Sequence, residues 1–171
     1  CSNLASIEIP NSVTSIADYT FEYCSSLANI VIGNSVKSIG NYAFQYCSNL
    51  ASIEIPNSVT SIGWYAFQYC SNLANIVIGN SVKSIAIGAF YGCSKLAIIE
   101  IPNSVTSIGD SAFNSCPNLK EINVDQMNSY YSSEDHVLYS KSKSILIKYP
   151  PKKESTNYRI PSDVTSIEIY A

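Results

Sequence analysis

Thiol chemistry is the first chemistry that this sequence suggests, because its six cysteines recur at a constant interval of 23 residues. They stand at Cys1, Cys24, Cys47, Cys70, Cys93 and Cys116. If each interval is one turn of a stack, neighbouring cysteines lie ~4.8 Å apart with parallel Cα–Cβ bonds, whereas a disulfide requires Cβ atoms at ~3.8 Å. A zinc site requires four converging ligands rather than a line of thiols. Of these three alternatives we predict a buried row of free thiols that is structural and not reactive.

The other residue types that support catalysis or metal binding form no known pattern. His136 is the only histidine, nothing marks a serine and an aspartate as its partners, and a multi-histidine metal site is excluded. No glycine-rich phosphate loop is present, and the Glu134-Asp135 pair lacks the spaced oxygen ligands of a calcium loop. Carboxylates ~10 Å apart on an open strand face would neither exclude water nor strongly shift a pKa. We predict no catalytic residue, no cofactor, no metal and no enzyme activity.

Further apolar columns share the interval of the cysteines and indicate a repeating structural unit. Its pattern is C-x-x-L-x-x-I-x-I-[PG]-N-S-V-[TK]-S-I-x-x-x-[AT]-F-x-x. The alternation I-x-I predicts a half-buried strand, Pro or Gly ends it, and Asn-Ser favours a turn. Between Val13 and Phe21 the apolar spacing favours a tight turn or short helix. One unit cannot bury its apolar side chains alone but stacked units can, so we predict a solenoid.

The unit resembles the 23-residue leucine-rich repeat of the BspA type, also called the Treponema pallidum type. The stretch I-E-I-P-N-S-V-T-S-I-G from Ile53 to Gly63, followed by Ala66-Phe67 and Cys70, carries the resemblance, which covers 1–124 and returns at 160–171. The resemblance implies an α/β-type repeat solenoid, a right-handed superhelix with a parallel sheet on its concave side and short helical or irregular returns. It also implies a cell-surface, extracellular protein of a bacterium or mucosal protist, often an adhesin.

We expect three parts: regular repeats over 1–124, an irregular variant repeat with a hairpin over 125–159, and the start of a further repeat over 160–171. The hairpin is predicted from two apolar runs, 137–139 and 145–149, on either side of the polar segment 140–144. Where many relatives of the resembled family have Asp-Gly, this chain has Asp135-His136, which puts the glycine-dependent turn geometry in question. Six of the ten basic residues lie in the irregular part and could steer a polyanion, although we favour an ordinary solvated hairpin.

Composition excludes two classes of partner. The formal net charge is −3 with no long basic block, so nucleic acid is not expected. No apolar stretch approaches the ~20 residues that cross a bilayer, so we expect no membrane insertion in this fragment. Neither end shows a polar capping repeat, and we expect open ends that allow end-to-end self-association.

Two surfaces are candidates for binding. Units alternate between a glutamate and a valine in mid-strand, so the full period is 46 residues and like charges lie ~10 Å apart, about one Debye length. Tyrosines form two further columns with Trp64 beside them, and Tyr favours interfaces. Each surface also has a purely structural interpretation: a solvated face that separates charges, and rings that cover the adjacent turn. The candidate protein-binding residues are Glu8, Val31, Glu54, Val77, Glu100, Asn123, Tyr19, Tyr42, Tyr65, Trp64, Tyr23, Tyr46 and Tyr69.

The sequence and the resemblance together favour a cell-surface module for non-covalent protein recognition or adhesion. The expected partner is a host matrix protein or a protein of a neighbouring cell, with a glycan as an alternative. Two other hypotheses stay open, in which the array has no ligand of its own: a structural stalk or spacer, and an intracellular scaffold.

Overall fold

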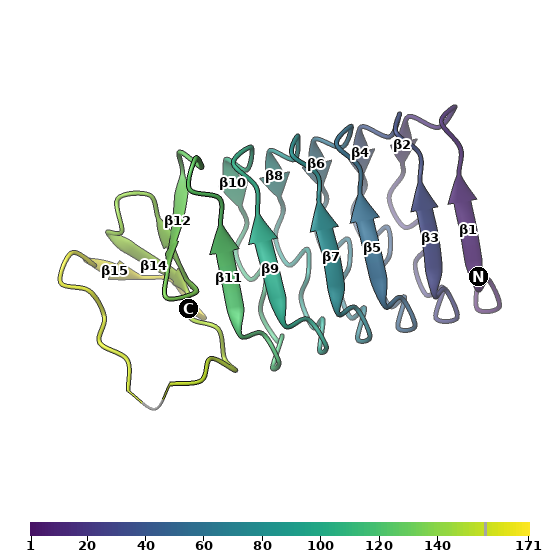
Figure 1. The fold of residues 1–171 in the computed structure, drawn as a ribbon. Coiled ribbons are helices and arrows are strands. Elements are labelled where there is room, and N and C mark those ends of the chain that lie inside the picture. Colours follow the sequence, from purple (N-terminus) through teal and green to yellow (C-terminus); the bar gives the residue numbers. More distant parts are fainter. Residues whose placement is uncertain (156) are drawn as a thin grey trace.

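The computed structural model describes residues 1–155 and 157–171 and has the form of an elongated rod of stacked turns (Figure 1). Each regular turn contributes a four-residue strand to one face of the rod and a two-residue strand to another. The long strands are β1 (Ser6–Ile9), β3 (Asn29–Ile32), β5 (Ser52–Ile55), β7 (Asn75–Ile78), β9 (Ile98–Ile101) and β11 (Glu121–Val124). The short strands are β2 (Ser15–Ile16), β4 (Ser38–Ile39), β6 (Ser61–Ile62), β8 (Ser84–Ile85) and β10 (Ser107–Ile108).

The strands of successive turns pair in parallel with a register of 23 residues, which confirms the predicted period. Ile7 lies opposite Ile30, and Ile53 opposite Ile76. Equivalent side chains therefore form continuous rows, and the phenylalanine row is a stack whose ring centroids lie 5.1–6.0 Å apart. The row consists of Phe21, Phe44, Phe67, Phe90 and Phe113, all buried.

The long strands form three separate two-stranded ribbons, β1-β3, β5-β7 and β9-β11, rather than one continuous parallel sheet. The continuous sheet is instead the five-stranded one built from β2 to β10. Figure 1 shows the long strands grouped in pairs along the rod. The first two ribbons each join a glutamate unit to the valine unit that follows it, and the third joins Glu100 to Asn123, so the 46-residue sequence period reappears as a structural period.

Glycine after β3 and β7 explains the pairing in the first two ribbons, whereas Asp125 follows β11 in the third. A Cβ on Gly33 would lie 2.7 Å from the carbonyl oxygen of Ile9, and a Cβ on Gly79 would lie 2.6 Å from that of Pro56. Both contacts are too short for any side chain, so only glycine lets the valine unit close onto the unit before it. The opposite side of each ribbon carries no such glycine, because proline follows the glutamate strands at 10, 56 and 102.

No helix occurs in residues 1–155 and 157–171, so the prediction of an α/β-type solenoid with short helical returns was wrong on this point. The reason lies in the hydrogen bonds of the return. Alternate amides donate to the next turn of the rod, as Tyr19 does to the Asn41 carbonyl (2.9 Å) and Phe21 to the Ala43 carbonyl (2.8 Å). The amide of Glu22 instead closes a tight turn on the Tyr19 carbonyl (3.1 Å). In an α-helix each of these amides would donate to the carbonyl four residues earlier. The amides of the return have other acceptors, so the return is not helical.

The irregular part and the start of the further repeat together form a four-stranded sheet, β12-β13-β14-β15, at one end of the rod. Its strands are β12 (Tyr131–Glu134), β13 (Val137–Ser140), β14 (Ile145–Lys148) and β15 (Ser166–Ile167). The predicted hairpin is confirmed as the antiparallel pair β13-β14. A second hairpin, β12-β13, turns at Asp135-His136 with φ of 50° and 63°, the signs of a type I′ turn, so this geometry forms without glycine. Residue 156, within the predicted irregular part, lies outside the described residues.

Candidate functional site

The five cysteines after Cys1 lie in one buried row and are all free thiols, as predicted. Each of the last four donates to a phenylalanine carbonyl 26 residues earlier; the Sγ of Cys47, for example, lies 3.2 Å from the oxygen of Phe21. Burial raises the pKa of the Cys47 thiol from its ordinary value of 9.0 to about 12, and that of Cys116 to about 11. Because the thiolate is the reactive form, this row is structural. Cys1, by contrast, is exposed.

The outward side chains of the long strands form the first candidate surface, which we call the long-strand face. Glu8 lies opposite Val31 in the ladder, and Glu54 opposite Val77, so a valine separates successive carboxylates as the sequence predicted. Val31 and Val77 are 61% and 60% exposed, and Ile98 is 44% exposed. Val31 and Val77 thus project from the middle of their strands, and Ile98 from the first position of β9, without a covering segment.

At the carboxyl-terminal end of the long-strand face the polar side chains are joined by hydrogen bonds. Asn123 lies opposite Glu100, and its Nδ2 donates to Glu100 Oε1 (2.9 Å) and more weakly to Glu121 Oε2 (3.4 Å). Its Oδ1 lies 2.8 Å from His136 Nδ1, which is also 3.6 Å from Glu121 Oε2. No local sequence pattern indicates this cluster, because the β12-β13 hairpin must fold back onto β11 to bring His136 there.

The two tyrosine columns form the second candidate surface, which we call the tyrosine double ladder. One ladder comprises Tyr19, Tyr42 and Tyr65, and the other Tyr23, Tyr46 and Tyr69. Within each ladder the rings stack with centroids 4.8–5.4 Å apart and interplanar angles of 5–18°. Aromatic pairs of this kind stabilise by about 0.5–1.5 kcal/mol beyond the area they bury.

Every tyrosine of the double ladder has a backbone conformation that disfavours side chains. The six φ values lie between 53° and 60°, in the left-handed region. For an L-residue this conformation costs roughly 1–2 kcal/mol. The fourth unit places Gly88 and Gly92 at the same two columns with φ of 62° and 73°, and the fifth places serines there. The chain therefore accepts strain at six positions where glycine would avoid it, and stacking offsets only part of that cost.

The ladders end where the last rings cover the glycines. A Cβ on Gly88 would lie 2.2 Å from the Tyr65 ring, and one on Gly92 would lie 2.5 Å from the Tyr69 ring. Tyr69 also meets Tyr91 edge to face at 5.6 Å. The rings thus cover the adjacent return, which is the structural interpretation offered above.

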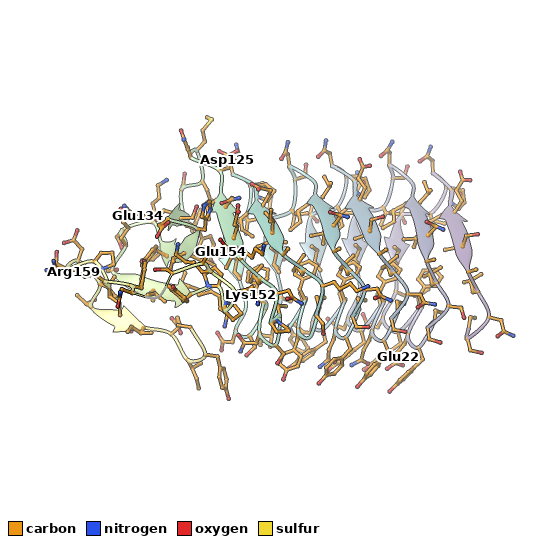
Figure 2. The ribbon with its side chains drawn as sticks, turned by 60° about the horizontal axis from the view of Figure 1, so that its bottom comes forward. Glu22, Asp125, Glu134, Lys152, Glu154 and Arg159 are labelled. Atoms are coloured by element: carbon orange, nitrogen blue, oxygen red, sulfur yellow. The ribbon has the colours of Figure 1, made fainter. Side chains whose placement is uncertain are left out.

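The double ladder nevertheless stays open to solvent. Tyr19, Tyr23 and Trp64 are 54%, 58% and 55% exposed. Figure 2 shows aromatic rings projecting in a row along the edge of the rod that carries Glu22. Ile87, one turn after Trp64 in the same column, is also exposed and was not among the predicted residues.

Among the described residues of the irregular part, Lys143 and Lys153 are ion-paired, whereas Lys141, Lys152 and Arg159 are exposed. Lys143 pairs with Glu134 at 2.7 Å, Lys153 with Asp135 at 2.8 Å, and Lys120 with Glu154 at 3.9 Å. Figure 2 shows Glu134, Glu154 and Lys152 gathered over this end of the rod.

Lys148 is half-buried, and this burial lowers the pKa of its ammonium group. Its Nζ donates to Asn114 Oδ1 (3.0 Å) and to the carbonyl of Tyr170. It borders a cavity of about 250 Å³, also lined by Asp110, Tyr131 and Glu168.

Two further findings concern the same described residues. Among residues 1–155 and 157–171, no three side chains of His, Cys, Asp or Glu gather closely enough to hold a metal ion. No helix in this part of the chain is long and apolar enough to span a bilayer.

Solved structures similar to this chain come from bacterial leucine-rich-repeat proteins. The pneumococcal vaccine antigen PcpA superposes with a TM-score of 0.90 at 32% identity, over 95% of this chain and 41% of its own. A leucine-rich cell surface protein from Faecalibacterium prausnitzii superposes at 0.74 with 34% identity, over 94% and 50%. The T. pallidum leucine-rich repeat protein superposes at 0.71 with 25% identity, over 95% and 68%. This chain thus spans half or less of the first two proteins.

No curated protein sequence matches the chain. The family model described as the BspA type leucine rich repeat region, in 6 copies, matches residues 1–120 and 62–171. These two matches together extend over the whole chain. The structure has the corresponding repeat, with a 23-residue register, a buried cysteine row and a phenylalanine stack. The chain belongs to the family of BspA-type leucine-rich repeat proteins.

Proposed function

We propose that this chain is a recognition module of a cell-surface protein and binds another protein non-covalently through its long-strand face. The observation that carries this proposal is the exposure of Val31 and Val77, by 61% and 60%, in the middle of paired strands. Apolar side chains in such positions stabilise nothing inside the rod, whereas contact with a partner would bury them. The similar F. prausnitzii protein is a cell surface protein, which supports the proposed location.

The charge pattern indicates the chemistry of the partner. Glu8, Glu54 and Glu100 flank the exposed valines and Ile98, and all three glutamates are exposed. Residues 1–124 carry seven acidic and four basic side chains, so the regular part contributes all of the net charge of −3. A partner surface with apolar contacts bordered by lysine or arginine would complement this face and would associate faster at low salt.

A glycan partner has less support than a protein. Sugars stack on the open faces of aromatic rings, but the faces of Tyr42 and Tyr46 are each covered by rings on both sides. Lys143 and Lys153 are paired with carboxylates and Lys148 is half-buried, so among the described basic residues of the irregular part Lys141, Lys152 and Arg159 remain exposed to hold a polyanion.

The test is adhesion of cells that display the whole protein to surfaces coated with purified host matrix proteins. In the variant Val31→Thr/Val77→Thr/Ile98→Thr the outward apolar groups become polar while the β-branched shape is kept, so the strands should persist. We expect adhesion to fall by about tenfold or more. The matched control Lys37→Thr/Lys83→Thr changes exposed residues of the same kind of unit outside the long strands and should leave adhesion unchanged. Undiminished adhesion of the triple variant would instead support the stalk hypothesis.

The alternative of an intracellular scaffold is tested separately. Protease treatment of intact cells should degrade the repeat region if it is displayed outside. Protection of the region from protease, with cleavage after lysis, would contradict a cell-surface location.

A further inference from the structure

The tyrosine double ladder has features that the proposed recognition by the long-strand face does not use. Six tyrosines occupy strained left-handed positions, and at its amino-terminal end Tyr19 and Tyr23 remain more than half exposed. Trp64 and Ile87 extend the same aromatic and apolar surface into the neighbouring column. A surface whose rings only covered the adjacent return would not need the exposed Trp64.

We propose that the tyrosine double ladder is the contact surface on which a second copy of this chain packs side by side, with the two rods antiparallel. This inference does not depend on which ligand binds the long-strand face. It concerns lateral pairing, which is distinct from association through the ends of the rod.

The spacing of the rings favours a second solenoid as the occupant. Inside each ladder the rings stack face to face at 4.8–5.4 Å, so the surface offers ring edges and phenol hydroxyl groups at that interval. A partner matches every ring only if its own side chains recur at the same interval. Stacked parallel turns have this repeat, whereas a polyproline helix rises ~9.3 Å per turn and a helix 5.4 Å per turn with side chains on a curved surface. Another copy of the ladder matches it ring for ring.

The charges of the surface select the antiparallel arrangement. The segments 41–46 and 64–69 contain no charged residue, whereas the first unit carries Asp18 and Glu22. If a two-fold axis passes through the second unit, Asp18 of one copy lies opposite Trp64 of the other, and Glu22 opposite Gln68. Parallel rods would instead place four carboxylates at the same end, where they repel one another. Two-fold pairing also closes the assembly, because each copy uses the same patch.

The extent of the surface sets the strength of the contact. Tyr19, Tyr23 and Trp64 are more than half exposed, Tyr69 is 37% exposed and the other three tyrosines are partly buried, so the seven side chains offer roughly 400–600 Å² per copy. Stable interfaces bury about 800 Å² per partner, so this pairing belongs with the weak, reversible class. Proteins held side by side on a cell would pair through it at high local concentration and so present several long-strand faces together.

The experiment is sedimentation velocity of the purified chain from about 1 µM to about 1 mM, with light scattering as a second measure of mass. We expect the mass to rise from 18.6 kDa towards twice that value as concentration increases. Tyr42→Gly/Tyr46→Gly removes the central rings and keeps the backbone, because Gly88 and Gly92 hold the same positions in the fourth unit. This variant should associate about tenfold more weakly or not at all. The control Val31→Thr/Val77→Thr should associate like the unchanged chain.

A pair of charge variants tests the arrangement. Trp64→Lys and Trp64→Glu lose the same aromatic contact and differ in the sign of the charge that they introduce. In the antiparallel arrangement the new lysine faces Asp18 and the new glutamate repels it, so the lysine variant should associate at least about threefold more tightly at low salt. Equal association of the two variants would overturn the antiparallel arrangement. A monomer at every concentration, or association that survives Tyr42→Gly/Tyr46→Gly, would overturn the proposal itself.

Discussion

The left-handed backbone of Tyr42 leads to an unusual order of stability among substitutions. Tyr42 has φ of 56° and stacks between Tyr19 at 5.0 Å and Tyr65 at 5.4 Å. Replacement by alanine removes both stacked pairs, a loss of about 1–3 kcal/mol, and keeps the strained backbone. Replacement by glycine removes the same pairs but relieves the strain, which is worth roughly 1–2 kcal/mol.

The difference between the two variants isolates the backbone contribution. Glycine also makes the unfolded chain more flexible, which costs about 0.4–1 kcal/mol relative to alanine. The strain is the larger of the two effects, so Tyr42→Gly should be more stable than Tyr42→Ala by about 0.5–1.5 kcal/mol. At an ordinary position the order is reversed. Thr14 is exposed and has no left-handed backbone, so Thr14→Ala should be more stable than Thr14→Gly by about 0.4–1 kcal/mol.

The assay is urea denaturation followed by circular dichroism for all four variants, with thermal unfolding as a second measure. For a chain of this length, 1 kcal/mol corresponds to about 2–4 °C in Tm. The reasoning is refuted if the alanine variant at position 42 is as stable as the glycine variant, or if the order at position 14 is inverted too. If the slope of unfolding free energy against urea concentration differs for one variant, the unfolding unit has changed. The variants would then be compared by thermal unfolding.

Three further predictions follow from the packing. Gly79→Ala forces a Cβ to within 2.6 Å of the Pro56 carbonyl and should open the β5-β7 ribbon, with a loss of about 2–4 kcal/mol in urea unfolding. The raised pKa values of the buried cysteines imply stability that is fully present below pH 9, the ordinary thiol pKa, and falls as pH rises towards 12, so Cys47→Ser should flatten this alkaline decline in a pH series of Tm. In the folded chain only the exposed Cys1 should react with a thiol reagent at neutral pH, and reaction of further thiols before unfolding would contradict the buried row. 

The sequence predicted those features that are one position copied many times. A constant interval requires the cysteines to share one environment, so the buried thiols and the register followed directly from the spacing. The alternation of Pro56 and Gly79 was visible too, but its consequence, strands grouped in ribbons, depends on a close approach of backbones that residue types alone do not reveal.

The features that were missed depend on backbone conformation and on long-range folding. The apolar spacing at 13, 16, 17 and 21 fits a helical turn, yet the amides of the return bond to the next turn of the rod instead. Gly88 and Gly92 stand in the same two columns as the tyrosines, and glycine is compatible with a left-handed backbone. Tyrosine rarely adopts that conformation, so the residue types did not predict it. The contact between His136 and Asn123 requires the hairpin to fold back over 13 residues, and no local pattern encodes that.

The two candidate surfaces differ in how freely they can change. Val31 and Val77 lie two turns apart on ordinary strands, so substitutions there should add independently. In the double ladder each central ring contacts two others, and each tyrosine has a strained backbone. Loss of one ring would remove stacking from its neighbours, whose backbone strain would then no longer be offset. Ladder residues should therefore be present together or absent together. The sequence has this form, because both columns change from tyrosine to glycine in the same unit, at Gly88 and Gly92.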